Sequence, residues 1–355
     1  MSVDVARAYH LAWRVGHRLP GGLVRAAMTL GADVAWWRRG SGVRRLEANL
    51  ARVRPELDSG ALRRLSRAGM RSYMRYFGEA FTLRGLTPEH LAARVRVEGM
   101  ENLRPDLDAG RQVVIALGHM GNWDLAGAWA AAHVAPVTTV AERLEPEELF
   151  QEFRAFRESI GLRIVPLTGE GDVFRRLVRV ARTGPGLLPL LADRDLTARG
   201  LEVDLFGHRA RVAAGPAALA VTTGATLVPA SITYERLRRA RRRAAGGPWG
   251  IVVRFHAPVQ ADPDAPRAER VHALTQAWVD VVAEQIHAHP QDWHMLQRVF
   301  VADLDPARDA ARRSPGAPPD DGAWTDDGAR TDDGAGTDGG AGTDGGDPLD
   351  VGSVS

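Results

Sequence analysis

Apolar runs of strand length alternate with stretches of helix length from about residue 95 onward. The clearest run is VVIAL at 113–117, and a helical pattern at 122–134 follows it. Such alternation is typical of α/β folds, in which helices connect largely parallel strands and cover the sheet. We therefore predict an α/β fold with a central mixed, partly parallel sheet covered by helices. The predicted strands are 112–117, 137–141, 163–167, 187–192, 201–207, 226–234 and 250–258, and the predicted helices are 122–134, 145–160, 170–183, 215–223 and 266–288.

The N-terminal part of the chain has helical periodicity instead. Residues 3–53 are predicted to form two or three amphipathic helices, and residues 58–85 one longer helix. Core packing explains their apolar stripes, but Trp and Leu beside Arg also suit the headgroup region of a membrane. The residues concerned are Leu11, Trp13, Trp36 and Trp37 with Arg7, Arg14, Arg38 and Arg39. Charged residues interrupt every long apolar stretch, so we expect neither a signal peptide nor a transmembrane helix.

Composition excludes several kinds of chemistry. The chain has no cysteine, and its 46 basic residues are all arginine, because lysine is absent. Thiolate metal sites, cysteine nucleophiles and lysine Schiff bases are therefore impossible. The net charge is +2, but residues 316–355 contain ten Asp and one Arg, so the preceding 315 residues must carry +11. A basic body indicates an anionic partner, such as a lipid surface, a phosphorylated substrate or nucleic acid.

A run of arginines lies between the last two predicted strands, in ERLRRARRRAAGGPWG at 235–250. We predict that this segment extends a hairpin. Its arginines could be solvated, or could contact lipid headgroups or nucleic-acid phosphates. No nucleic-acid-binding motif accompanies them, so we favour an anionic membrane surface and expect no nucleic acid. The residues are Arg236, Arg238, Arg239, Arg241, Arg242 and Arg243.

The stretch GHMGNWD at 118–124 holds the residues best placed for chemistry, because α/β folds gather their sites where strands end. Asn122 is a predicted helix N-cap, which puts Asp124 in the first helical turn. A carboxylate that accepts from one imidazole nitrogen lets the other take a proton from a hydroxyl group. We predict His119 as general base and Asp124 as its orienting partner. The alternatives are a structural loop histidine and an aspartate that only complements the helix dipole.

The His119-x4-Asp124 spacing is similar to the H-x4-D/E motif of glycerolipid and lipid A acyltransferases. With its further segments, the chain resembles the actinobacterial phosphatidylinositol mannoside acyltransferases, of the lysophospholipid and lipid A acyltransferase superfamily, over roughly residues 3–300. Those segments are GHMGNWDLAGAW, VAERL, FRESIGLRIVPL, LLADRDL, LFGHRARVAAGPAALA and HPQDWHMLQ.

The resemblance implies a peripheral enzyme at the cytoplasmic face of the plasma membrane. It would move a long-chain acyl group, with palmitoyl expected, from acyl-CoA to a mannose hydroxyl of mannosylated phosphatidylinositol. Acyl-CoA would be a co-substrate, and we expect no bound cofactor and no metal. The alternatives are an acyltransferase for another glycolipid or lysolipid, a non-catalytic lipid-binding protein, and a glycosyltransferase-type α/β protein.

The resemblance also assigns individual residues. Glu142 and Arg157 match a family pair that lines the active-site cleft. An acidic residue of the DRDL segment is expected to face the dyad, with Asp193 the better match and Asp195 its rival, although glutamate is the commoner family residue there. Arg194 and Arg199 could bind anionic parts of acyl-CoA or of the headgroup.

A second cluster of polar residues lies in HPQDWHMLQ at 289–297, which offers His289, Asp292 and His294. Their spacing matches no established metal pattern. We predict that this segment caps and packs a terminal helix.

The predicted organisation is an acyltransferase domain at 1–314 followed by a tail at 315–355. The domain would comprise interfacial helices over about 1–93 and an α/β core over about 94–305. The tail repeats TDDGAR, TDDGAG and TDGGAG and has almost no large apolar side chains. Burial therefore cannot offset the entropy of ordering it, and we predict disorder.

Deletion of residues 316–355 should leave the thermal midpoint and the catalytic activity nearly unchanged, because a disordered tail adds no packing to the domain. Differential scanning calorimetry of the full-length and shortened chains tests this prediction. A drop of several degrees on deletion would show that the tail docks on the body.

Overall fold

The computed structural model describes residues 19–141, 147–166, 170–195 and 200–304. Seven strands form the main sheet in the order β1-β9-β8-β2-β5-β3-β4, and two more form a separate pair, β6-β7. The strands are β1 Val95–Glu98, β2 Gln112–Leu117, β3 Val137–Ala141, β4 Leu162–Pro166, β5 Gly186–Leu191, β6 Leu201–Leu205, β7 His208–Val212, β8 Thr226–Arg236 and β9 Trp249–Phe255. The α-helices are α2 Gly21–Arg38, α3 Ser41–Val53, α4 Ser59–Leu83, α5 Pro88–Arg94, α6 Arg104–Asp108, α7 Trp123–His133, α8 Glu147–Ser159, α9 Glu170–Ala181, α10 Gly215–Thr223, α11 Arg239–Ala244 and α12 Arg267–Ala288.

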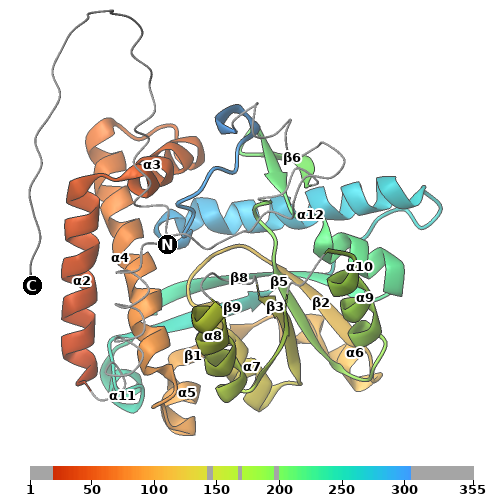
Figure 1. Ribbon diagram of the computed structural model, residues 1–355, viewed down its shortest axis with the longest axis horizontal. Helices are drawn as coiled ribbons and strands as arrows, with labels where there is room; N and C mark the ends of the chain where they lie inside the picture. Colours follow the sequence, from red (N-terminus) through yellow and green to blue (C-terminus); the bar gives the residue numbers. More distant parts are fainter. Residues whose placement is uncertain (1–18, 142–146, 167–169, 196–199, 305–355) are drawn as a thin grey trace, which may run out of the picture.

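Most of the main sheet is parallel. β2 pairs in parallel with β5 and β8, and β3 pairs in parallel with β4 and β5. β9 runs antiparallel to β8, and β1 joins β9 in parallel at the edge. The predicted fold class, a mixed and partly parallel sheet covered by helices, is confirmed (Figure 1).

Strand β2 is buried on both faces, which explains its continuous apolar sequence. Val113, Ile115 and Leu117 join the core cluster under α7, whereas Val114 and Ala116 join the cluster under α9, α10 and α12. Because β2 lies between β5 and β8, its carboxyl end opens at the middle of the sheet. The loop that follows β2 is therefore surrounded by protein on several sides.

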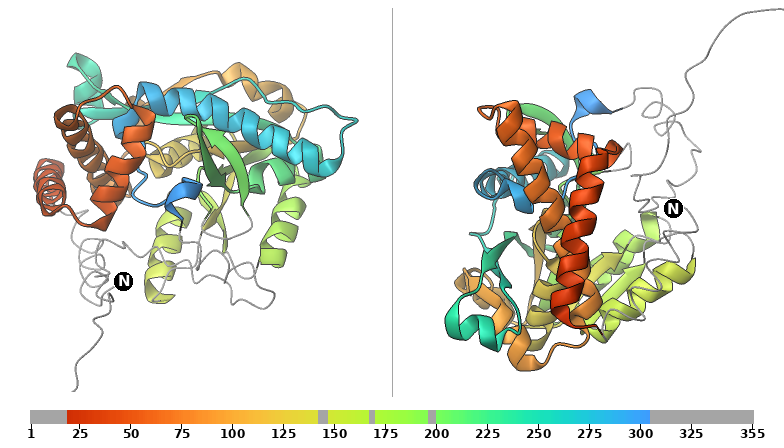
Figure 2. Two further views of the ribbon diagram at one scale, coloured as in Figure 1. Left: turned by 90° about the horizontal axis from the view of Figure 1, so that it is seen from above. Right: turned by 90° about the vertical axis from the view of Figure 1, so that its left-hand side faces the viewer.

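Helices α2, α3 and α4 gather at one end of the sheet and share a core cluster of their own (Figure 2). The predicted helices over 3–53 and 58–85 are thus confirmed where the structure describes them. The predicted core packing is confirmed for Trp36, which donates to Ser66 within this cluster, whereas Trp37 is 76% exposed. Among the described helices, none joins enough length to enough apolarity to cross a bilayer. The interfacial candidates at positions 7–14 and the tail at 315–355 lie outside the described residues.

Two local predictions change in the structure. The single strand predicted at 201–207 is half of a hairpin, because Phe206 and Gly207 have φ angles of 56° and 74°. Two consecutive positive angles make the tight turn that reverses a hairpin, and β7 follows. The arginine-rich segment does connect two antiparallel strands, as predicted, but it forms the short helix α11 between them.

Candidate active site

The loop between β2 and α7 brings the predicted catalytic residues to the carboxyl end of the sheet. Asn122 caps α7 as predicted, since its side chain accepts from the amide of Leu125 at 2.9 Å. Gly121 has a φ of 59°, and a Cβ atom there would lie 2.5 Å from the carbonyl oxygen of Ile232. Only glycine fits this close approach of two backbones, which fixes the path of the chain from His119 into the helix.

His119 is held by Asp193, which follows the neighbouring strand β5. The ring nitrogen Nδ1 lies 2.5 Å from one carboxylate oxygen of Asp193, and the backbone amide of His119 donates to the other at 2.9 Å. Burial alone would raise the pKa of Asp193, but His119 and the hydrogen-bond donors outweigh burial and hold this pKa below its usual value. Asp193 is therefore a carboxylate at neutral pH and favours the tautomer of His119 that carries its proton on Nδ1.

The predicted contact between His119 and Asp124 is wrong. Asp124 accepts from the guanidinium of Arg157 at 2.9 Å and from the hydroxyl of Tyr76 at 2.7 Å. The reason is the geometry of the helix start, because a side chain in the first turn of α7 reaches the flanking helices α4 and α8. Burial and the charge of Asp124 raise the pKa of Tyr76 well above its usual value, so the phenol keeps its proton as a donor.

Four further predicted positions take no part in the contacts of His119 and Asp124 described above. Glu142 and Arg199 are not among the described residues. Arg194 is partly buried directly after Asp193. Asp195 does not take the place beside His119, because its carboxylate lies against Gly200.

The arginine-rich segment divides into packed and exposed members. Arg241 pairs with Glu235 at 2.6 Å, and Arg236 lies over the ring of Trp249 at 4.7 Å. Arg236 is nevertheless exposed, and so are the other four on or beside α11, which leaves Arg238, Arg239, Arg242 and Arg243 available to a surface.

Trp293 is a site residue that sequence reasoning missed. Its indole nitrogen donates to Asp193 at 2.8 Å, and the ring is fully buried. The segment around Trp293 also pairs through its backbone with the loop between β2 and α7. The amide of Gly121 donates to the carbonyl of Asp292, and the amide of His294 donates to the carbonyl of His119. His289 caps the C-terminus of α12, as predicted, but the segment also builds the site, which was not predicted. The available signal was the unusual density of aromatic and polar residues in HPQDWHMLQ.

No metal centre accompanies these residues in the described part of the chain, where no three His, Asp or Glu side chains converge on one point. His294 is instead fully buried, and desolvation lowers its pKa to about 3. Its ring therefore stays neutral and packs beside Tyr73 and Trp123.

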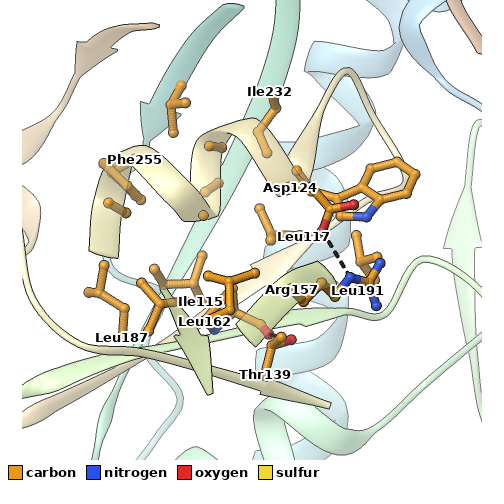
Figure 3. Close-up of a pocket in the computed structure, with 18 of the residues that line it drawn as sticks. Ile115, Leu117, Asp124, Thr139, Arg157, Leu162, Leu187, Leu191, Ile232 and Phe255 are labelled. Carbon is orange, nitrogen blue, oxygen red and sulfur yellow. Dashed lines mark hydrogen bonds and ion pairs between the residues drawn. The ribbon is translucent and has the colours of Figure 1, made fainter. Parts of the chain in front are cut away.

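An apolar cavity of about 80 Å³ runs beside α7 from the pair formed by Asp124 and Arg157. Figure 3 shows the two side chains facing each other at one end of the cavity, with Leu187 and Phe255 at the other. Ile115 and Leu117 line it from β2, two residues apart and thus on one face of the sheet. The cavity therefore runs inward along the strands from the carboxyl edge where His119 lies.

Sequence comparisons with known proteins point to one family of enzymes. The family model described as bacterial lipid A biosynthesis acyltransferase matches residues 5–301. The phosphatidylinositol mannoside acyltransferase of Mycolicibacterium smegmatis is 39% identical over 304 residues, which cover 85% of this chain and 93% of that protein. The protein of the same name from Mycobacterium tuberculosis is 40% identical over 310 residues, covering 86% and 92%. Among solved structures, the 1-acyl-sn-glycerophosphate (LPA) acyltransferase PlsC from Thermotoga maritima matches with a TM-score of 0.33 and 16% identity, covering 72% of this chain and 94% of that one.

Replacing Trp293 by Phe should remove one donor from Asp193 and leave a small void at a fully buried position. Hydrogen bonds to charged groups contribute about 1.5–3 kcal/mol, so the free energy of unfolding at pH 7 should fall by about that amount. The native pKa of Asp193 should rise towards its unfolded value. A carboxyl group whose native pKa lies below its unfolded pKa stabilises the folded state at neutral pH. This contribution of Asp193 should therefore become smaller in the variant.

Urea denaturation at pH 7 measures the stability change, and carboxyl ¹³C NMR of Asp-labelled protein gives the direction of the pKa change. The matched control is Trp129→Phe, because Trp129 stacks on exposed His133 away from Asp193. Equal losses of stability in the two variants would mean that the indole donor does not support the carboxylate.

Proposed function

The chain belongs to the bacterial lipid A biosynthesis acyltransferase family, and from this membership we propose that it acylates a mannose hydroxyl of phosphatidylinositol mannoside with acyl-CoA as donor. Family membership supports an acyltransferase that acts on a glycolipid. The acceptor is proposed from the names of relatives that are 39% and 40% identical. A long acyl chain, with palmitoyl expected, is proposed from the family resemblance, and the apolar cavity beside the site would take part of that chain.

The observation that carries the proposal is the buried pair of His119 and Asp193 at the mouth of that cavity. Asp193 accepts from Nδ1, so Nε2 of His119 would take the proton from the acceptor hydroxyl. The acceptor oxygen would attack the thioester carbonyl carbon and form a tetrahedral intermediate. When the carbon–sulfur bond breaks, the proton on Nε2 would pass to the sulfur, and coenzyme A would leave as the thiol.

Asp124 would act by positioning in this scheme. Its ion pair with Arg157 joins α7 to α8, and its hydrogen bond with Tyr76 joins α7 to α4. All three helices border the cavity mouth or the catalytic loop. Asp124 would therefore hold the entrance for the acyl chain rather than exchange protons with His119.

A membrane-facing surface is also part of the proposal. Helix α2 carries exposed apolar side chains at positions that share one face, namely Leu23, Leu30, Val34 and Trp37. The exposed arginines of α11 lie at the same end of the molecule (Figure 1). An apolar stripe beside clustered arginine suits peripheral binding to an anionic membrane, proposed here to be the cytoplasmic face of the plasma membrane.

The direct test is mass spectrometry of lipid products after incubation with palmitoyl-CoA and mannosylated phosphatidylinositol. We expect one added acyl group on a mannose, and His119→Ala should lower the rate by about 10²–10⁴-fold, the usual contribution of a general base. The matched control is His133→Ala, an exposed histidine of α7, which should retain the wild-type rate.

Folded His119→Ala protein that turns over at the wild-type rate would refute the mechanism. Transfer to lysophospholipids but not to mannosylated lipid would refute the acceptor. The absence of any transfer, with lipid binding intact, would favour a non-catalytic lipid-binding protein.

Membrane binding should have an electrostatic part that salt weakens and an apolar part that survives salt, because exposed charges are screened within about 8 Å at physiological ionic strength. Changing Arg238, Arg239, Arg242 and Arg243 to Gln should remove most of the salt-sensitive part. Sedimentation with neutral and anionic vesicles across a salt series measures both parts.

The matched control removes four exposed arginines at the far sheet edge, Arg163, Arg175, Arg179 and Arg182. It should leave the preference for anionic vesicles largely in place. Equal loss in the two quadruple variants would show that total charge, and not the α11 surface, determines binding.

A further inference from the structure

A second cavity, of about 250 Å³, lies between α2, α4, α5 and the segment that joins α11 to β9. These elements meet at one end of the molecule (Figure 1). Its volume is far above the ~10–15 Å³ that one water molecule requires. Neither His119 nor the apolar cavity beside α7 shares its lining. The acyl-transfer chemistry proposed above therefore gives this space no role.

The lining of this cavity is strongly basic. It includes four arginines, Arg25, Arg71, Arg75 and Arg94, with a single carboxylate, Glu79. Two of these arginines interact with other side chains, whereas Arg94 donates from Nε to the backbone carbonyl of Ala245 at 2.9 Å. Arg71 forms an ion pair with Asp33, and Arg75 lies over the ring of Trp249 at 3.7 Å.

The other two guanidinium groups converge at Gly247. Nitrogen atoms of Arg94 and Arg25 lie 3.5 Å and 3.6 Å from the point where a Cβ of this glycine would stand. Within the described ranges, neither arginine has a carboxylate at ion-pair distance. Burial lowers the pKa of Arg94, Glu79 partly offsets this effect, and Arg25 adds to the lowering. Two like charges thus meet in a cavity, and one of them is largely buried.

Glu79 does not neutralise this pair by direct contact. Its carboxylate accepts from the amide of Asn122 at 2.8 Å and from the hydroxyl of Tyr234 at 3.1 Å. Burial raises the pKa of Glu79, which weakens its counter-charge further. The cavity therefore has an excess of positive charge that an anion from outside the chain would relieve.

We propose that this cavity binds a phosphate ester group between Arg25 and Arg94. Guanidinium groups bind phosphate oxygens through paired, charge-assisted hydrogen bonds, and two converging groups can hold one phosphate from two sides. The phosphate could belong to an anionic lipid headgroup or to a free soluble ester. The apolar side chains of Leu19, Val24 and Met28 line the same cavity, and the exposed stripe of α2 lies on the same helix.

The proposal does not depend on acyl transfer, and binding tests it without turnover. Arg25→Glu is the informative variant, because Arg25 is only partly buried and the new carboxylate would lie near Arg94. The repulsion between Arg25 and Arg94 would be replaced by attraction between Glu at position 25 and Arg94. This variant should therefore be at least as stable as the wild type while it excludes external anions. Arg163→Glu, at the opposite sheet edge, makes the same change of charge on an exposed residue.

The first experiment follows the thermal midpoint with inorganic phosphate and with glycerophosphoinositol at constant ionic strength. A ligand that binds only the native state raises this midpoint with concentration. We expect a rise for the wild type and for Arg163→Glu, and a dissociation constant at least about tenfold weaker for Arg25→Glu. No rise in the wild type, or the same rise in Arg25→Glu, would overturn the proposal.

The second experiment identifies the source of the phosphate. Phosphatidylcholine vesicles with and without phosphatidylinositol are sedimented with the same three proteins. A preference for phosphatidylinositol that Arg25→Glu loses and Arg163→Glu retains would support the lipid headgroup. Soluble binding without that preference would support the free ester, and equal loss of both kinds of binding in the two variants would overturn the site.

Discussion

The buried carboxylate of Asp193 is the constraint on which the rest of the site depends. An ionised carboxylate removed from water must receive hydrogen bonds, or its charge becomes too costly. Asp193 contacts the ring nitrogen and backbone amide of His119 and the indole of Trp293. These contacts require β2 beside β5, a loop that bends at Gly118 and Gly121, and a C-terminal segment that returns across the sheet. The fold supplies all three, so the position of His119 follows from the sheet order.

Helix α4 supports this arrangement from the opposite side with a polar stripe. Ser72, Tyr76 and Glu79 recur at helical spacing and face the loop and the C-terminal segment. Ser72 contacts Asp292, Tyr76 contacts Asp124, and Glu79 contacts Asn122. Asn122 and Asp124 lie at the start of α7, and Asp292 lies in the short turn that follows α12, so α4 holds both segments in place. The helical end of the molecule is therefore a structural support of the site as well as the surface proposed to bind lipid.

The sequence predicted those features that local rules determine. The apolar run of β2, the N-cap at Asn122 and the mixed α/β sheet were all recovered, because periodicity and capping act over a few residues. The partner of His119 was predicted less well. Asp124 is only five residues from His119, so local spacing favoured it. Asp193 and Trp293 are far from His119 in the sequence and are brought to it by the sheet order and by the return of the chain after α12. The hairpin of β6 and β7 was likewise not predicted. The alternation of apolar residues did not indicate β7, which follows the turn with positive φ angles at Phe206 and Gly207.

The two carboxylates near His119 therefore differ in kind, although both are buried. Asp193 contacts Nδ1 of the imidazole and fixes the orientation of the His119 ring. Asp124 has its charge balanced by Arg157 and its second oxygen occupied by Tyr76, so little of that charge is left to act on the imidazole. What it fixes is the spacing of α4, α7 and α8 around the apolar cavity. In the proposed mechanism, the six residues from His119 to Asp124 thus serve two separate tasks, which are proton transfer on the β5 side of the loop and placement of the acyl chain on the α8 side.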